Sequence, residues 1–422
     1  MRVSSIAAAG LLSLTAGCTV PRPAPAPGAP ACALPGVPLR IDLGTGSRLG
    51  AQAEAPEDPM VSILRNAAAA RSAGIEALGP PQPRASHLVL SGGGQDGAFG
   101  SGFLAGLAPL PDYDVVTGVS TGALQAPLAL LGNEAPPDDR RLDAADDFPA
   151  DANRPGRRNI DDLVSGYSIS REGSLYRSRG VAGILRKAAS GDLAPLRRRI
   201  GLLITDQTLR RLAMLDPRRR GLFTLLLNWD TGDAERIDML ELARRYAGGD
   251  RHARDCFIDV MIAASSEPLG TPPVPIDDHL YVDAGLRFGV FAVNAIEAGA
   301  EAARTFRSPR AAGTASSAPV IRTDMIRNGD LTVPYSAPPR YSALDIVGRA
   351  RKILVNQVYA FSMRDVLARA GDGQQVRFAF ITKDEIAAGP PAKGVEFDPA
   401  YMARMLLIGR DRRGAWNEVR PS

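Results

Sequence analysis

The order of apolar and polar residues predicts strands and helices in alternation along most of the chain. Short apolar runs, or apolar residues at alternate positions, are typical of strands and occur at 87–90, 114–119, 222–227 and 376–380. Longer alanine-rich or amphipathic stretches are typical of helices and occur at 59–78, 121–131 and 344–361. This alternation predicts an α/β fold, a three-layer α/β/α sandwich around a mostly parallel central sheet.

Two segments depart from this alternation. Residues 132–175 are polar and rich in turn-forming residues, so we expect a surface insertion that is either a lid over a site or a plain exposed loop. Residues 18–55 begin with a proline- and alanine-rich stretch and predict an extended tether. The remaining boundaries predict a helical lead-in at 56–85, a main domain at 86–385 and a C-terminal extension at 386–422 that packs on it.

The first seventeen residues have the pattern of an export signal. Arg2 precedes a short apolar stretch, 6–14, which is too short to cross a bilayer. Small residues then lead to Cys18, as in the cleavage box of bacterial lipoproteins, although that box usually has leucine where Thr15 stands. We expect export, lipid attachment at Cys18 and anchoring in the bacterial envelope, on its periplasmic or outer-membrane face. The alternatives are an ordinary secretory signal and an uncleaved anchor.

Composition and charge narrow the class of protein. With 45% hydrophobic and 23% charged residues, the chain has the balance of a globular protein. A net charge of +4 is too small for this length to indicate a nucleic-acid partner. The three cysteines and three histidines lack metal-ligand spacing, so we expect no structural zinc. The sequence leaves open whether Cys32 and Cys256 pair, and it identifies no protein partner.

The first candidate motif is a glycine-rich turn between a predicted strand and a predicted helix. Gly92, Gly93, Gly94 and Gly97 lie in the stretch "GGGQDG". Similar turns bind dinucleotides, but here no acidic residue ends a second strand at the usual distance, and an exported protein meets little nucleotide. The turn also suits an oxyanion, because its main-chain N–H groups and the positive end of the next helix attract negative charge.

The second motif is Gly-x-Ser-x-Gly, which runs from Gly118 to Gly122 between a strand and a helix. The two glycines permit a tight turn that lifts Ser120 to its tip, which is how a nucleophilic serine is held. The Thr121 N–H is then placed to donate to the same oxyanion. The alternative is a plain turn whose serine caps a helix.

The third motif supplies a candidate base for the serine. Asp283 ends a short apolar run and is followed by Ala284 and Gly285. There it would accept the Ser120 proton directly, provided that burial raises its pKa from the usual value near 4. No histidine follows Asp283, which disfavours the Ser-Asp-His order of the α/β-hydrolases. The alternative is an aspartate that only caps a turn.

Together the three motifs resemble the patatin-like phospholipase family, in the same order and over about 86–382. The resemblance implies that Ser120 is the nucleophile, that Asp283 is the base of a Ser–Asp dyad, and that Gly93 and Gly94 donate to the oxyanion. Two departures stand out. Asp96 occupies a position where the family often has arginine or lysine, and Asp283 is followed by Ala-Gly instead of Gly-Gly or Gly-Ala.

The resemblance also implies a fold and an activity. It implies a patatin-like α/β/α sandwich that hydrolyses lipid or phospholipid acyl esters through an acyl-enzyme, in the manner of a phospholipase A or lysophospholipase. No metal or cofactor is required, and a lipid anchor would hold the protein at the membrane surface. A non-catalytic lipid-binding lipoprotein on the same scaffold is the alternative, and the two departures are its support.

Overall fold

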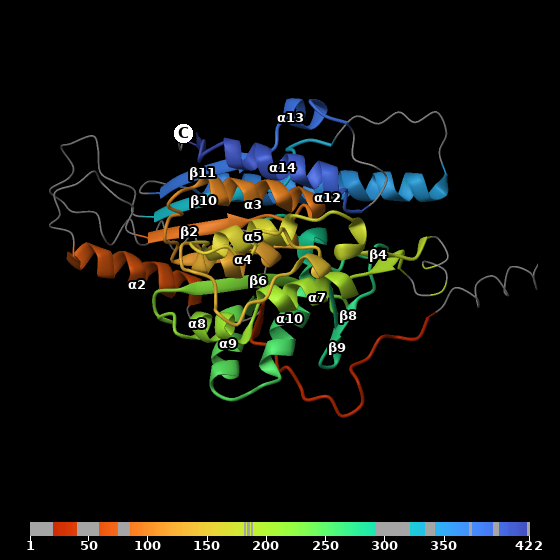
Figure 1. Ribbon diagram of the computed structural model, residues 1–422, viewed down its shortest axis with the longest axis horizontal. Helices are drawn as coiled ribbons and strands as arrows, with labels where there is room; N and C mark the ends of the chain where they lie inside the picture. The colour runs from red at the N-terminus through yellow and green to blue at the C-terminus, as the bar shows by residue number, and fades with distance from the viewer. Residues whose placement is uncertain are drawn as a thin grey trace, which may run out of the picture.

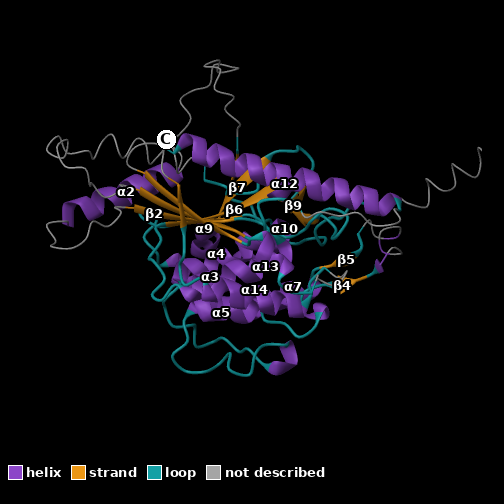
Figure 2. Ribbon diagram, turned by 90° about the horizontal axis from the view of Figure 1, so that it is seen from above, coloured by secondary structure: helices purple, strands orange, loops and turns teal. Residues whose placement is uncertain are grey.

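A central sheet separates two layers of helices (Figures 1 and 2). The computed structural model describes residues 20–39, 59–74, 85–180, 183, 186, 189–292, 321–333, 342–370, 374–390 and 396–419. The predicted fold class, an α/β sandwich with a sheet of mostly parallel strands at its centre, is confirmed.

Five parallel strands form the centre of the sheet, in the order β6 (Gly221–Asn228), β3 (Val115–Gly118), β2 (Ala85–Leu90), β10 (Ile321–Arg327) and β11 (Gln374–Phe380). Antiparallel strands complete the sheet: β7 (Ala234–Asp238) and β1 (Gly36–Pro38) beyond β6, β12 (Asn417–Val419) beyond β11, and the hairpin of β8 (Val274–Ile276) and β9 (His279–Asp283). The hairpin pairs with the end of β6, so that Asp283 lies opposite Leu226. The ends of β2, β3, β9 and β10 therefore meet at one edge, where α/β folds carry their sites.

One face of the sheet carries most of the helices: α3 (Gly97–Gly106), α4 (Thr121–Leu131), α5 (Asn159–Tyr167), α7 (Ala194–Leu203), α8 (Asp206–Ala213), α9 (Met239–Ala247), α10 (Ala253–Ala264) and α14 (Pro399–Asp411). The other face carries α2 (Pro59–Gly74) and α12 (Ala343–Arg369) (Figure 2). Strand residues alternate between the two layers, since Leu88 and Leu90 enter the larger core while Val89 packs with Met363.

The β4 (Arg177–Ser178) and β5 (Gly191–Asp192) ladder and helix α13 (Lys383–Ala387) are short elements outside these layers. Among the helices that the structure describes, none combines the length and the apolar character that crossing a bilayer requires.

The C-terminal extension is built into the fold. Helix α14 packs closely against α3. The two backbones are so near that a side chain on Gly102 would overlap the Leu406 carbonyl and one on Gly409 would overlap the Phe99 carbonyl. Strand β12 adds to the edge of the sheet beside β11. The extension thus forms part of both the larger helical layer and the sheet.

The polar insertion at 132–175 is more ordered than a plain exposed loop. It contains α5, and its few apolar side chains, among them Leu142, Phe148 and Ile160, are buried in the larger core. Two of its charged residues are buried too, Arg140 and Asp162, which form an ion pair of 3.0 Å. The polar composition concealed these contacts, because the buried residues are separated by turns and follow no single period.

The N-terminal segment differs from the tether prediction over residues 20–39, because it is tied to the domain at Arg22 and again from Cys32 to β1, while most of the residues between are exposed. Strand β1 pairs with β7, and a disulfide joins Cys32 to Cys256 with a Cα–Cα distance of 5.6 Å. Arg22 forms a two-pronged ion pair with Asp230 at 2.6 and 2.7 Å. The prolines keep this segment extended, and an extended chain can pair with an exposed sheet edge. Cys18 lies outside the described residues.

Breaking the disulfide should destabilise the protein and release this segment. Cys32→Ser removes a link between residues 224 positions apart, so we expect a loss of about 2–5 kcal/mol in the free energy of unfolding. Denaturant titration measures the loss, and limited proteolysis should cut within 20–39 sooner. Reductant should weaken the wild type and leave the variant unchanged. Equal stability of the variant and the oxidised wild type would contradict the bond.

Candidate active site

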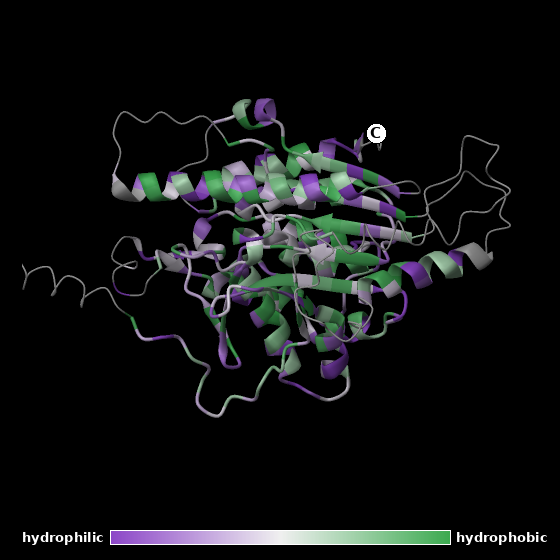
Figure 3. Cartoon of the chain, turned by 180° about the vertical axis from the view of Figure 1, so that it is seen from behind, coloured by the Kyte–Doolittle hydropathy of each residue, from purple (hydrophilic) through white to green (hydrophobic). Residues whose placement is uncertain are grey.

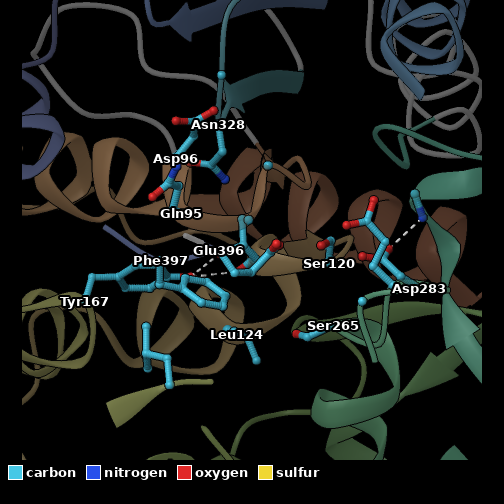
Figure 4. A pocket seen from close by; sticks show the side chains of 18 of the residues that line it. Gln95, Asp96, Ser120, Leu124, Tyr167, Ser265, Asp283, Asn328, Glu396 and Phe397 are labelled. Carbon is cyan, nitrogen blue, oxygen red and sulfur yellow. Dashed lines mark hydrogen bonds between the residues drawn. The ribbon is translucent and has the colours of Figure 1, made fainter. Parts of the chain in front are cut away.

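The carboxyl edge of the sheet borders a cavity of about 600 Å³, shown in Figure 4. Its walls come from the turn after β2, the turn before α4, helices α5, α7 and α12, and the ends of β9 and β10. Six residues predicted from the three motifs line it: Gly93, Gly94, Ser120, Thr121, Asp283 and Gly285. The fold therefore brings the three motifs together around one space of the size that holds a small-molecule ligand.

Ser120 sits in a strained turn between β3 and α4. Its backbone has φ 54° and ψ −127°, a conformation that residues other than glycine rarely adopt and that costs on the order of 1–3 kcal/mol. The flanking glycines make the turn possible, because a side chain on Gly118 would overlap Gly122 and one on Gly122 would overlap the Leu90 carbonyl. The turn points the Ser120 side chain into the cavity, as the sequence predicts.

Asp283 is the last residue of β9, and its side chain lies beside Ser120 (Figure 4). Burial raises the pKa of its carboxyl group to about 7, although interaction with the Ser120 hydroxyl and the Gly285 N–H opposes this rise. The Gly285 N–H donates to Oδ1 at 2.7 Å and orients the carboxyl group. Near neutral pH a large fraction of Asp283 is thus ionised and basic enough to take a proton from a hydroxyl group.

The glycine-rich turn presents bare backbone to the cavity. In the described part of the chain, the main-chain N–H groups of Gly93, Gly94 and Thr121 donate to no protein acceptor. Side chains cannot intrude here, because one on Gly92 would overlap the Tyr359 hydroxyl and one on Gly93 would overlap Asn328. The turn thus offers free donors beside Ser120, which is the arrangement that stabilises an oxyanion.

Four motif residues contribute to packing and do not line the cavity: Gly97, Gly118, Gly122 and Ala284. Gly97 lies where a side chain would overlap Thr121 and Tyr167, so it keeps the glycine-rich turn close to α4 and α5. The Tyr167 hydroxyl also makes a short hydrogen bond to the Thr121 hydroxyl. Ala284 is fully buried and does not line the cavity. Gly118 and Gly122 act through the shape of the serine turn.

A cation that sequence analysis missed lies beside Asp96. Arg327, at the end of β10, donates from Nη1 to the Gly92 carbonyl at 2.9 Å, and its guanidinium lies 4.0 Å from the centre of the Tyr359 ring. Burial raises the pKa of Asp96 to about 6, while a hydrogen bond of 2.6 Å from the Tyr401 hydroxyl and the charge of Arg327 oppose the rise. The positive charge absent from position 96 is therefore supplied by another strand. No local pattern could have linked residue 327 to this turn.

An ion pair that the sequence analysis did not identify lies near Asp283. Glu267, in the loop after α10, forms a short ion pair with Arg351 of α12. The Glu267 charge raises the pKa of Asp283, and the Arg351 charge lowers it. The pair therefore couples the candidate base to α12.

All three histidines are among the described residues, and none lines the cavity. His87 is buried in β2, where burial lowers its pKa to about 3 and its Nε2 lies 3.0 Å from the Thr117 hydroxyl. His252 lies beside Cys32, and His279 lies 3.5 Å from Asp230. The geometry therefore offers Ser120 no histidine partner.

One group of side chains in the described part of the chain has the spacing of metal ligands. The ligand atoms of Cys32, His252 and Cys256 lie within 4.8 Å of one another, far along the chain from the three motifs. Metal binding requires thiolates, and the disulfide occupies both sulfur atoms. The group therefore fits a metal only after reduction.

Comparison with known proteins agrees with the motifs. The family model described as patatin-like phospholipase matches residues 88–296, which contain all three. No curated protein matches the chain. Among solved structures, the chain is similar to VipD from Legionella pneumophila at 13% sequence identity and a TM-score of 0.30, covering 79% of this chain and 66% of that one. The chain thus spans just under two thirds of that protein.

The raised pKa of Asp283 predicts a pH-dependent cost to stability. An unfolded aspartate has a pKa near 4, and the folded one titrates at about 7. Its contribution to stability is therefore complete below pH ~4 and is lost as the pH rises to ~7. Asp283→Asn stays neutral, so its free energy of unfolding should fall less than that of the wild type between pH 5 and 8, as measured by denaturant titration.

Ser120→Ala is the matched control, because it retains the aspartate and should keep most of the wild-type slope. Asp96 and Asp162 also titrate at about 6, but they contribute equally to all three proteins. Parallel curves for Asp283→Asn and the wild type would show that the pKa of Asp283 is not raised.

Proposed function

Because residues 88–296 form a patatin-like phospholipase domain, we propose that this protein is a serine lipid acyl hydrolase of the phospholipase A or lysophospholipase type. The observation that carries the proposal is the strained Ser120 turn beside the buried Asp283 carboxyl group, in one cavity with free N–H donors. A serine and an aspartate with a pKa near 7 suffice for hydrolysis of an ester.

In the proposed reaction, the Ser120 Oγ attacks the ester carbonyl carbon while its proton moves to the Asp283 carboxylate. The carbonyl oxygen becomes an oxyanion that accepts hydrogen bonds from the Gly93, Gly94 and Thr121 N–H groups. Collapse of this intermediate breaks the bond to the alcohol, which leaves with the proton from Asp283. Water then attacks the acyl-serine, Asp283 again takes the proton, and the fatty acid departs as Ser120 recovers its hydrogen.

The lining of the cavity supports a lipid substrate. On the side of α4, α5 and α7 the lining side chains are mostly apolar: Leu124, Leu128, Leu163, Leu196, Ile200 and Leu203. On the side of α12 they include Glu267, Glu396, Arg351 and Lys352. We assign the apolar side to the acyl chain and the charged side to the polar part of the lipid, because each then meets a surface of its own kind.

A dyad predicts that the serine and the aspartate are equally necessary. Ser120→Ala and Asp283→Asn should each lower hydrolysis of a chromogenic acyl ester by about a hundredfold or more, the usual scale for a general base. A fluorophosphonate probe should label Ser120 in the wild type. Circular dichroism verifies the fold of each variant.

Alanine variants of His87, His252 and His279 are the controls and should stay far more active. A well-folded histidine variant as inactive as Asp283→Asn would show that a histidine takes the proton. No turnover by the wild type, together with binding of fatty acid or lysolipid, would favour a non-catalytic lipid-binding lipoprotein, which the departures at Asp96 and Ala284 also suit.

We further propose that the protein is exported and anchored through an acylated Cys18. The small residues before Cys18 support this, and so does the disulfide of Cys32 with Cys256, because such bonds persist in oxidising compartments. Cys18 lies just before the segment 20–39, which is tied to the domain, so an acyl group on Cys18 would hold the enzyme near its lipid substrate.

The anchor predicts a mass shift at the new N-terminus and partition with membranes. Cys18→Ala should abolish the mass shift and greatly reduce the partition with membranes, because acyl chains supply most of the affinity for the bilayer. Intact mass spectrometry and membrane fractionation provide the test. Wild-type protein that is processed but carries no acyl group would support an ordinary secretory signal.

A further inference from the structure

Helix α12 has an apolar face that no other part of the described chain covers. On its inner side Tyr359, Met363 and Val366 are buried, the last two in a core with strand residues. On its outer side five large apolar residues are 46–66% exposed: Ile346, Val347, Ile353, Leu354 and Phe361. A helix that is apolar on two opposite sides is normally buried on both, but among the described residues none covers the outer face.

The exposed residues form one stripe along the helix. Leu354 follows Val347 by seven positions, and Phe361 follows Leu354 by another seven, a spacing that keeps side chains on one side of a helix. Figure 3 shows apolar and polar residues interleaved along α12. The exposed apolar residues therefore share one side of the helix instead of being scattered around it.

The stripe lies beside the candidate active site. The inner side of α12 lines the cavity through Arg351, Val355 and Tyr359. The N-terminal half of the helix extends beyond the body of the fold on the side of the carboxyl edge of the sheet (Figures 1 and 2). Only the thickness of one helix separates the stripe from the cavity, about 10–12 Å.

The charge of α12 indicates the chemistry of its partner. Helix α12 carries five basic residues (Arg349, Arg351, Lys352, Arg364 and Arg369) and two acidic ones (Asp345 and Asp365). Arg349 and Arg364 form no ion pair within the described part of the chain. A second copy bound through the same face would bring like charges together, whereas anionic headgroups complement them.

We propose that the outer face of α12 binds the surface of an anionic lipid bilayer. The stripe enters the boundary between headgroups and acyl chains, Arg349 and Arg364 contact the headgroups, and the helix lies in the plane of the interface. Binding itself needs no catalysis. The delivery of lipid to the cavity beneath α12 rests on the proposed function.

The test uses full-length protein carrying Cys18→Ala, so that no acyl anchor contributes. Binding is measured by sedimentation with vesicles of phosphatidylglycerol and phosphatidylcholine, and with vesicles of phosphatidylcholine alone. Replacing Val347, Leu354 and Phe361 together with serine should raise the dissociation constant at least tenfold, because the apolar area that enters the bilayer is lost. The matched control is Met214→Ser with Leu407→Ser, since these residues are 78% and 60% exposed elsewhere, and it should bind like the parent protein.

A charge variant separates the two contributions. Arg349→Gln with Arg364→Gln should weaken binding to the anionic vesicles and change binding to phosphatidylcholine little. Hydrolysis of a soluble chromogenic ester should be unchanged in the triple serine variant, while hydrolysis of vesicle lipid should fall with binding. If neither the parent protein nor its variants cleave either substrate, but the triple serine variant still binds vesicles more weakly, then the membrane-binding proposal holds and the proposed function fails.

Two results would overturn the proposal. One is a folded triple serine variant that binds anionic vesicles as tightly as the parent protein. The other is a dimer, detected by light scattering, that the triple variant dissociates while vesicle binding persists; the stripe would then be an interface between two copies of this chain.

Discussion

Burial of the Asp283 carboxyl group beside Ser120 is the constraint on which the rest of the candidate site depends. An aspartate in water is a poor base for a hydroxyl group, and only removal from solvent raises its pKa to about 7. That burial requires β9 to pair with the end of β6, and the Asp283 N–H is further held by the Ser266 carbonyl at 3.0 Å. The sheet therefore determines both where the carboxyl group lies and how it titrates.

Close backbone packing solves a second problem, which is to place N–H donors beside the serine without side chains in the way. The turns at Gly93 and Gly122 each lie against neighbouring carbonyl groups at distances that leave no room for a Cβ atom. The same crowding holds Ser120 in its strained conformation. The strained turn therefore lowers the free energy of unfolding, and burial of apolar side chains in the large cores on either side of the sheet raises it.

Contacts from distant segments place charged and polar side chains around the positions where the sequence departs from the family pattern. Asp96 would leave an unfavourable buried charge near the glycine-rich turn, yet Arg327 and Tyr401 converge on it from β10 and α14. Glu267 and Arg351 connect the surroundings of Asp283 to α12 in a similar way. The departures from the family pattern are therefore accompanied by charges that the pattern does not describe.

The sequence by itself determined the features that short-range chemistry controls. Apolar periodicity located β2, β3, β6, β11 and most of α2, α4 and α12, and the glycines around Ser120 indicated its turn, because glycine placement and side-chain period act within a few residues. The tertiary structure alone decided the pairing of Cys32 with Cys256, the cavity wall formed by α5, the place of Arg327 and the pKa of Asp283. Each of these depends on which distant segments meet and how much water they exclude, and no local pattern encodes either quantity.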